Sequence, residues 1–314
     1  MRQARISAAA ALVLLVGFGL ADTLWAADRA PDNEAVARGA YLIRAAGCIA
    51  CHTDKKGGGA PLTGGRALQT PFGTFYTPNL TPDPETGIGR WSDDDFIRAL
   101  SEGVSPDGRN YYPAFPYTTY SRMSRADMLD LKAFLSAQAP AHRPNTPHEL
   151  IFPFSWRVTN WPWKVLFFAP APFEPDPAQS PEINRGAYLV NALAHCGECH
   201  TPRNLLGAVD NDDFLSGTTS GPDGEIVPNI TPDAATGIGD WSTKDLVFLL
   251  RTGFLPNGND VQGGMREAID DGLKFLSQAD LEAIAAYLKS IRPIDHQVRK
   301  KRTQSGQGGA TAYD

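Results

Sequence analysis

The sequence contains the same pattern twice, and this duplication constrains its fold more than any other feature. Arg-Gly-Ala-Tyr-Leu begins at Arg38 and again at Arg185, and a Cys-x-x-Cys-His motif follows each copy. Further along, a Pro-Asn-x-Thr-Pro-Asp segment begins at Pro78 and again at Pro228. Such self-similarity indicates a tandem duplication, so one fold class has to account for both copies.

The repeat divides the chain into two predicted domains of about 110 residues each, a usual domain size. We predict a first domain at 27–138, a second at 179–293, and a connecting segment, here called the strap, at 139–178. The strap is rich in proline and aromatic residues, which is too apolar for a flexible tether. We expect it to pack across both domains, and the alternative is an aromatic surface on which a partner docks.

Both chain ends differ in composition from the repeats. Arg2 and Arg5 precede an apolar run of about 15 residues that leads to a small-residue site ending at Ala26, the pattern of a secretory signal peptide. A spanning helix needs about 20 apolar residues, so cleavage is favoured over an uncleaved anchor. We therefore predict a signal peptide at 1–26 and a mature chain without a transmembrane segment. The predicted location is the periplasm, and any membrane association is expected to be peripheral, at the inner membrane. Residues 294–314 are predicted to form a basic, disordered tail.

The charge balance limits the class of partner. The chain has 29 Lys and Arg against 35 Asp and Glu, a net charge of −6. An acidic surface argues against nucleic acid as a ligand and favours a protein partner with a basic docking patch.

The periodicity within each copy predicts helices joined by long loops. Each copy should have one helix before its cysteine pair, a short second helix, and an amphipathic last helix. The predicted ranges are 33–45, a start at Ser92 and 124–137 in the first copy, and 181–194, a start at Ser242 and 277–291 in the second. Asp32 and Ser180 are the expected caps of the first helices. Residues 66–90 and 216–240 are dense in Gly, Pro, Thr and Asn and predict loops, and no alternation favours strands, so the predicted fold class is all-α.

The two Cys-x-x-Cys-His motifs carry the chemistry. Two thiols at this spacing can each add to one vinyl group of the same porphyrin, and the following histidine becomes the proximal iron ligand. A zinc site or a disulfide is the alternative for a single pair, but two such pairs in duplicated domains behind a signal peptide favour haem. We predict two covalently bound haem c groups in two tandem class I cytochrome c-like domains. The cofactor-binding residues are Cys48, Cys51, Cys196 and Cys199, and the proximal ligands are His52 and His200.

A six-coordinate haem iron needs a distal ligand, for which methionine suits electron transfer. Met265 follows two glycines in a predicted loop before the last helix, and we assign it to the second haem. Met123, just before the last helix of the first copy, is the candidate for the first haem, whereas Met128 is expected in the core. Counting back from the two last helices, with a three-residue gap allowed, the counterpart of Met265 is nearest to Phe115, which is not a methionine.

The remaining histidines have other predicted roles. His195 precedes Cys196 and is expected to cap the preceding helix, while His296 falls in the basic tail. His142 and His148 lie in the strap and are expected to be solvated, although either could ligate the first iron in place of methionine.

Two further pairs of residues are predicted to support the haem sites. A backbone carbonyl commonly orients a proximal histidine, and Pro78 and Pro228, in the repeated Pro-Asn loops, are the expected acceptors. Gly39 and Gly186 are predicted to let the first helix cross closely over the last, because a methyl group there would push the helices apart.

Three stretches carry a family resemblance: Arg38 to Thr53, Tyr111 to Tyr117, and Asn184 to Asn204. They resemble the cytochrome c subunits of bacterial membrane-associated dehydrogenases of the alcohol and gluconate type, and the related cytochromes paired with molybdenum hydroxylases. Many of those subunits have three haem domains and a methionine where Phe115 stands.

The resemblance implies a periplasmic electron-transfer protein without a catalytic site of its own, which passes electrons from a partner dehydrogenase to a quinone or terminal oxidase. The alternatives are a dihaem enzyme such as a peroxidase, with an open first haem, and a haem-bearing docking scaffold.

Overall fold

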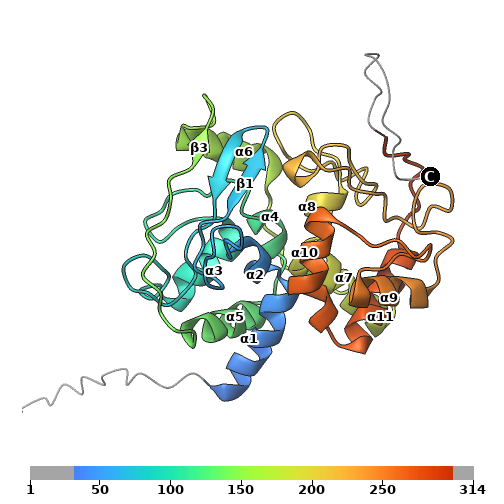
Figure 1. Ribbon diagram of the computed structural model, residues 1–314, viewed down its shortest axis with the longest axis horizontal. Helices are drawn as coiled ribbons and strands as arrows, with labels where there is room; N and C mark the ends of the chain where they lie inside the picture. Colours follow the sequence, from blue (N-terminus) through green and yellow to red (C-terminus); the bar gives the residue numbers. More distant parts are fainter. Residues whose placement is uncertain (1–31, 300–314) are drawn as a thin grey trace, which may run out of the picture. The chain divides into compact units, whose positions relative to one another are not determined.

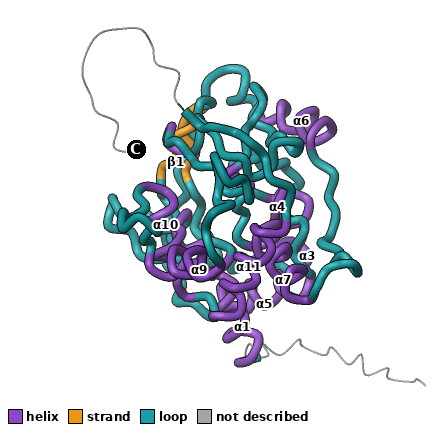
Figure 2. Tube along the Cα trace, turned by 90° about the vertical axis from the view of Figure 1, so that its right-hand side faces the viewer, coloured by secondary structure: helices purple, strands orange, loops and turns teal. Residues whose placement is uncertain are grey.

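Helices separated by long loops make up the computed structural model, which describes residues 32–299 (Figures 1 and 2). The predicted signal peptide and all but the first residues of the predicted tail lie outside the described residues. The first repeat contains α1 (Asn33–Ala45), α2 (Cys48–Cys51), β1 (Ala67–Thr70), β2 (Gly73–Tyr76), α3 (Asp93–Glu102), α4 (Tyr117–Tyr120) and α5 (Arg125–Ser136).

The strap and the second repeat follow. The strap contains β3 (Glu149–Leu150) and α6 (Asn160–Phe167). The second repeat contains α7 (Pro181–Tyr188), a π-helical turn (Leu189–Leu193), α8 (Gly197–His200), α9 (Thr243–Thr252), α10 (Gly263–Asp271) and α11 (Gln278–Ser290). Short 3₁₀ turns lie at Arg157–Thr159, Pro222–Gly224 and Leu273–Phe275.

The predicted helix starts are confirmed, because a polar side chain caps each one. The cap accepts a hydrogen bond from a backbone N–H two or three residues later, which satisfies one of the free donors of the first turn. The caps are Asp32, Ser92, Ser124, Ser180, Ser242 and Ser277. At α3 and α9 a reciprocal capping box with Asp95 or Asp245 adds a second bond.

The second repeat absorbs one extra residue as a π-helical turn. Ten positions separate Arg38 from Cys48, but eleven separate Arg185 from Cys196. The helix predicted at 181–194 is present over 181–193, and its last five residues, Leu189–Leu193, form π-helical turns. A π-bulge is the usual way in which a helix accommodates a single insertion, so both cysteine motifs keep the same position relative to their repeat.

The prediction of an all-α fold is wrong for one part of the molecule. β1, β2 and β3 form an antiparallel sheet in that order, with Ala67 opposite Tyr76 and Gly73 opposite Leu150. β1 alternates only between exposed and half-buried residues, so its sequence shows no apolar alternation. The sheet is completed by β3 of the strap, which is distant in the sequence, and no local pattern can reveal such a pairing.

The strap contacts both repeats and also exposes apolar side chains. The Tyr112 hydroxyl donates to the carbonyl of Phe154 at 2.9 Å, and the Trp163 indole N–H donates to the carbonyl of Leu206 at 2.8 Å. On the outer side, however, Phe152 is 70% exposed and Trp161 is 64% exposed. The strap is therefore packed against the repeats on one side only.

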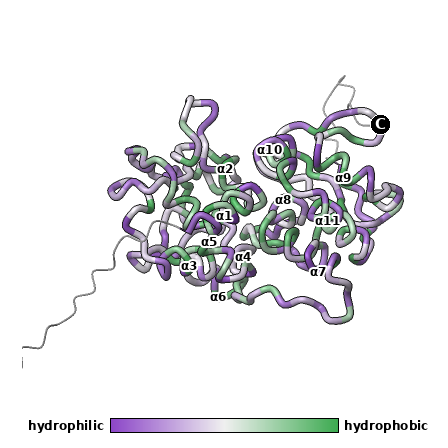
Figure 3. Tube along the Cα trace, turned by 90° about the horizontal axis from the view of Figure 1, so that it is seen from below, coloured by the Kyte–Doolittle hydropathy of each residue, from purple (hydrophilic) through white to green (hydrophobic). Residues whose placement is uncertain are grey.

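Close helix crossings hold each repeat together, as predicted. A Cβ atom on Gly39 would lie 2.0 Å from the carbonyl oxygen of Asp130 on α5, and one on Gly186 would lie 1.9 Å from that of Ala283 on α11. Met128 is buried in the core beside Leu131, also as predicted. Hydrophobic residues gather around α5 and α11, and the projecting loops are largely hydrophilic (Figure 3). Among the helices of residues 32–299, none is long and apolar enough to cross a membrane.

Candidate haem sites

The first Cys-x-x-Cys-His motif forms a single helical turn. The backbone N–H of His52 donates to the carbonyl of Cys48 at 2.8 Å, which closes the turn and brings the histidine onto the side of the cysteines. The Nδ1 atom of His52 lies 2.8 Å from the carbonyl oxygen of Pro78. A carbonyl can only accept, so Nδ1 carries the proton and Nε2 keeps its lone pair for a metal.

The second motif repeats this geometry. The backbone N–H of His200 donates to the carbonyl of Cys196 at 2.9 Å, and its Nδ1 lies 2.8 Å from the carbonyl oxygen of Pro228. The predicted acceptors for both histidines are therefore confirmed. Since the two imidazole–carbonyl distances are equal, each repeat orients its histidine by the same means.

Burial sets the protonation state of both motifs. Desolvation lowers the pKa of His52 to about 4, against the raising effect of its bond to Pro78, and burial also lowers the pKa of His200. Burial raises the pKa of Cys48, Cys196 and Cys199 to about 12. Each motif thus offers two neutral thiols and one neutral imidazole with a free Nε2, and this donor set fits a covalently attached haem.

A left-handed leucine followed closely by a glycine supports each histidine, and neither pair is among the residues predicted from the sequence. Leu62 and Leu215 have φ of 64° and 65° and are 3% and 0% exposed. Gly64 and Gly217, two residues on, donate to the carbonyls of the motif histidines at 2.8 and 2.7 Å. A Cβ atom on Gly64 would lie 2.4 Å from the carbonyl carbon of Pro78, so only glycine fits there.

A repeated signal could have revealed these supports. Leu-Thr-Gly at 62–64 and Leu-Ser-Gly at 215–217 occur at matching places after the two motifs. The threonine that follows each motif histidine accepts from the leucine backbone N–H, at 3.3 Å for Thr53 and 3.1 Å for Thr201. Backbone strain of about 1–3 kcal/mol at a non-glycine residue persists only where surrounding bonds enforce it, as these do.

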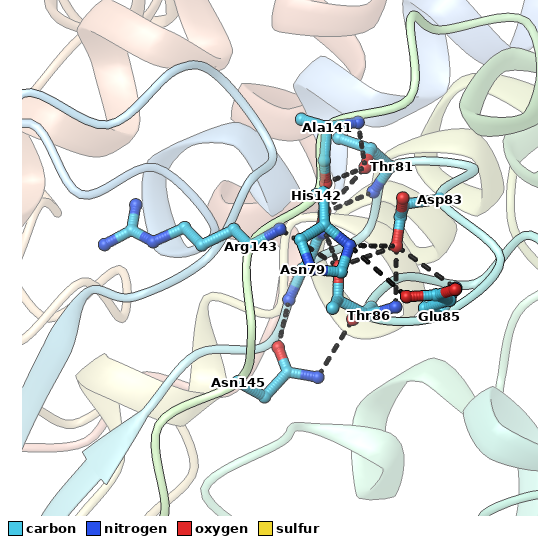
Figure 4. Close-up of polar contacts among 9 residues, drawn as sticks. All are labelled: Asn79, Thr81, Asp83, Glu85, Thr86, Ala141, His142, Arg143 and Asn145. Atoms are coloured by element: carbon cyan, nitrogen blue, oxygen red, sulfur yellow. Dashed lines mark hydrogen bonds and ion pairs between the residues drawn. The ribbon is translucent and has the colours of Figure 1, made fainter.

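The chain segment that follows the last helix holds the Pro-Asn loop in each repeat. In the first repeat the Asn79 side-chain amide donates to the carbonyl of Ala141 at 2.7 Å, and the Thr86 hydroxyl accepts from the backbone N–H of Arg143 at 3.0 Å (Figure 4). In the second repeat Asn229 makes the same bond to Ile294 at 2.7 Å.

Three of the remaining histidines, His142, His148 and His296, lie in or close to these anchoring segments. In the second repeat the backbone N–H of His296 donates to Thr236 at 3.0 Å, so the first residues of the predicted tail are attached to the repeat. In the strap, His142 is 59% exposed and lies 3.6 Å from Asp83, whereas His148 accepts from the backbone N–H of Tyr76 at 3.2 Å.

The candidate distal ligands occupy different environments. Met123 is 3% exposed and lies three residues after Tyr120. The Tyr120 hydroxyl donates to the carbonyl of Ala46 at 2.6 Å, and Ala46 is two positions before Cys48. The expectation that Met265 lies in a loop is wrong, because it is on the first turn of α10. It is half-buried against the core. Their roles as iron ligands remain predictions.

The two motifs approach one another at the contact between the repeats. His195, next to Cys196, takes a left-handed conformation (φ 43°) after the helix end, and its ring centroid lies 5.6 Å from that of Tyr120 in the first repeat. Burial lowers the pKa of His195. The Tyr41 hydroxyl donates to Asp280 on α11 at 2.6 Å, so the first helix of one repeat is also joined to the last helix of the other.

An arginine binds the carbonyl before the second cysteine in both motifs. Arg66 donates to the carbonyl of Ala50 at 2.7 Å and pairs with Glu267 of the second repeat at 2.6 Å. Arg203 donates to the carbonyl of Glu198 at 2.9 Å and pairs with the carboxylate of the same residue at 2.5 Å.

The carboxylate of Glu198 also accepts from Thr119 of the first repeat, at 2.7 Å. Each motif is therefore bound to the opposite repeat through one buried or half-buried carboxylate, and this fixes the two motifs relative to one another.

Comparisons with known proteins agree with this geometry. The cytochrome c family model matches residues 36–139. A dihaem c-type cytochrome of Cereibacter sphaeroides is 40% identical over 302 residues, which cover 92% of this chain and 99% of that protein. The gluconate 2-dehydrogenase cytochrome c subunit of Pantoea cypripedii is 42% identical and covers 86% of this chain and 62% of the subunit. The cytochrome c subunit of the alcohol dehydrogenase (quinone) of Gluconacetobacter polyoxogenes is 39% identical, and the match covers 91% of this chain and 61% of that subunit.

Two Cys-x-x-Cys-His motifs with equally oriented histidines, together with these relatives, define the class as a cytochrome of the c type. The chain belongs to the dihaem c-type cytochromes related to the cytochrome c subunits of alcohol and gluconate dehydrogenases. The resemblance inferred from the sequence is thus confirmed. The chain spans about three fifths of the length of the two dehydrogenase subunits that it matches.

Proposed function

We propose that this protein is a periplasmic electron-transfer protein that carries two covalently attached haem c groups. The observation that carries the proposal is the repeated geometry of His52 and His200, each with Nδ1 on a proline carbonyl and Nε2 free beside two neutral thiols. A haem iron in such a site supplies one-electron chemistry, and the chain supplies its attachment, its axial ligand and an apolar surrounding. Cys48 and Cys51 attach the first haem, and Cys196 and Cys199 attach the second.

Met265 is the proposed distal ligand of the second haem and Met123 that of the first. Both are thioethers within or against the apolar core, where a sulfur ligand that favours ferrous iron is shielded from water. Two such ligands, together with His52 and His200, would leave neither iron free to bind a substrate, as expected of a carrier and not of a peroxidase.

The proposed partner is a periplasmic or membrane-associated dehydrogenase, and a quinone or a terminal oxidase is the proposed acceptor. The names of the related gluconate and alcohol dehydrogenase subunits support this assignment. The outer side of the strap is the proposed contact surface for the dehydrogenase, because Phe152, Trp156 and Trp161 are each more than 60% exposed there. Exposed apolar patches of this kind commonly mark protein interfaces.

The central test is the mass and colour of the denatured protein. After acid extraction, the protein should keep its colour and carry the mass of two haems on a chain that begins near Ala27. The double variant Cys196→Ala, Cys199→Ala should retain one haem. A parent protein with one haem or none contradicts the proposal. A parent with a high-spin haem and rapid peroxide reduction supports the dihaem peroxidase instead.

A further inference from the structure

One peptide group in the first repeat is hydrogen-bonded at both ends. The carbonyl oxygen of Pro78 accepts from Nδ1 of His52 at 2.8 Å, and the N–H of Asn79, which belongs to the same peptide group, donates to Oδ1 of Asn145 at 2.8 Å. Asn145 itself is held in place, because its amide group donates to the carbonyl of Thr86 at 3.0 Å (Figure 4). A continuous chain of hydrogen bonds therefore leads from Asn145 to the imidazole.

The second repeat has the matching peptide group but a different residue at the end of the chain. The bond of Asn79 to Ala141 corresponds to that of Asn229 to Ile294, both at 2.7 Å, which aligns the two anchoring segments. Four residues further on, Asn145 corresponds to Val298. An isopropyl side chain has no hydrogen-bond acceptor, so among residues 32–299 this side-chain relay is present in the first repeat and not in the second.

The relay bears on the electronic character of His52. Hydrogen bonds in series polarise one another, so an acceptor at the Asn79 N–H increases the negative charge on the Pro78 carbonyl oxygen. A stronger acceptor at Nδ1 makes the imidazole a more basic ligand, as outer-shell partners of metal-bound histidines generally do. A more basic ligand stabilises ferric iron and lowers the reduction potential.

We propose that Asn145 is a positioning residue for the axial histidine of the first haem, acting through the Pro78–Asn79 peptide to lower the potential of that haem. The proposal rests on the proposed attachment of a haem to Cys48 and Cys51 with His52 as its ligand. It gives the strap a second role, because a strap residue tunes one of two otherwise similar sites.

The test is a redox titration of the haem-loaded protein and of Asn145→Ala, followed in the visible spectrum. Loss of the acceptor should change the ratio of oxidised to reduced protein at one haem about threefold. This corresponds to a fraction of the free energy that one neutral hydrogen bond contributes. At 59 mV per tenfold for one electron, that potential rises by about 28 mV, and the other potential does not change. Two unchanged potentials, or an equal shift of both, overturn the proposal.

Two further variants keep the test decisive. Thr146→Ala removes the neighbouring exposed side chain of the same segment, which does not bond to the Pro78–Asn79 peptide, and it should leave both potentials unchanged. Should Asn145→Ala fail to accumulate, Asn145→Asp carries the test in comparison with Thr146→Asp, which adds the same charge one residue away. A carboxylate at position 145 can accept from the Asn79 N–H, so Asn145→Asp should lower the potential more than Thr146→Asp does. An unchanged or raised potential in Asn145→Asp counts against the relay. The mass of the parent decides haem attachment separately, so failure of the proposed function is distinguished from failure of the relay.

Discussion

Replacing Gly186 with alanine should destabilise the second repeat, because α7 and α11 cross there with no room for a methyl group. The new Cβ atom would lie 1.9 Å from the carbonyl oxygen of Ala283 and 2.7 Å from Cβ of Tyr287, both on α11. Ordinary van der Waals contact begins at 3.4 Å, so the two helices have to move apart to accept the substitution. The nearest obstacle is a backbone atom, which no change of rotamer can move.

The magnitude follows from two opposing terms. Overpacking a core costs about 1–3 kcal/mol, and a backbone obstacle places this variant near the upper end of that range. Alanine has the higher helix propensity, which offsets about 1 kcal/mol of that cost. We therefore expect the free energy of unfolding to fall by about 2 kcal/mol.

The assay is urea denaturation of the haem-loaded protein, followed by far-ultraviolet circular dichroism. Gly264→Ala is the matched control, because its nearest neighbour is Oε2 of Glu225 at an ordinary 3.5 Å, and it should be as stable as the parent or slightly more so. A Gly186→Ala protein with the stability of the parent would refute the inferred close crossing of α7 over α11.

Three other variants test the sites and the contact between the repeats. Burial opposes the ionisation of Asp280, but hydrogen bonds from Arg185 and Tyr41 outweigh it and lower the pKa of this carboxyl group. Its contribution to the free energy of unfolding is therefore fully present above the unfolded pKa near 4, and it is lost as the pH falls through the lower folded pKa. Asp280→Asn should therefore lower the urea midpoint at pH 7 and flatten its decline below about pH 4. Met265→Ala should abolish one methionine-to-iron charge-transfer band and lower one potential, and unchanged potentials would make Met265 a packing residue. Met123→Ala should open the first site, measured as carbon monoxide binding and weak peroxidase activity that the parent lacks.

The features predicted correctly from the sequence depend on short-range chemistry or on the repeat itself. A serine such as Ser92 caps a helix through a bond to a residue three positions away, so a short window of sequence is sufficient. The carbonyls of Pro78 and Pro228 are predictable as histidine acceptors because each proline lies in a loop that recurs with its Cys-x-x-Cys-His motif. The one-residue insertion before Cys196 was visible in the sequence, but its accommodation as a π-helical turn was not.

The features that were missed depend on contacts between distant segments. β1 is paired through β2 with β3 of the strap. β1 shows no apolar alternation, and β3 has only two residues. Leucine is an unfavourable residue for the left-handed conformation of Leu62 and Leu215, and a propensity argument would have placed glycine there. Only the bonds from the loops that surround them explain why these leucines are tolerated.

The duplication produced two sites that orient the histidine identically but differ in what surrounds it. The imidazole–carbonyl distances are equal, whereas the residue before the second cysteine is Ala50 in one motif and the carboxylate-bearing Glu198 in the other. In the first repeat the peptide group that accepts from the histidine is also bonded to Asn145, and in the second repeat the residue that corresponds to Asn145 is Val298. Because potential depends on outer-shell bonds and nearby charge as well as on the ligands, two haems with the same proximal geometry should differ in potential.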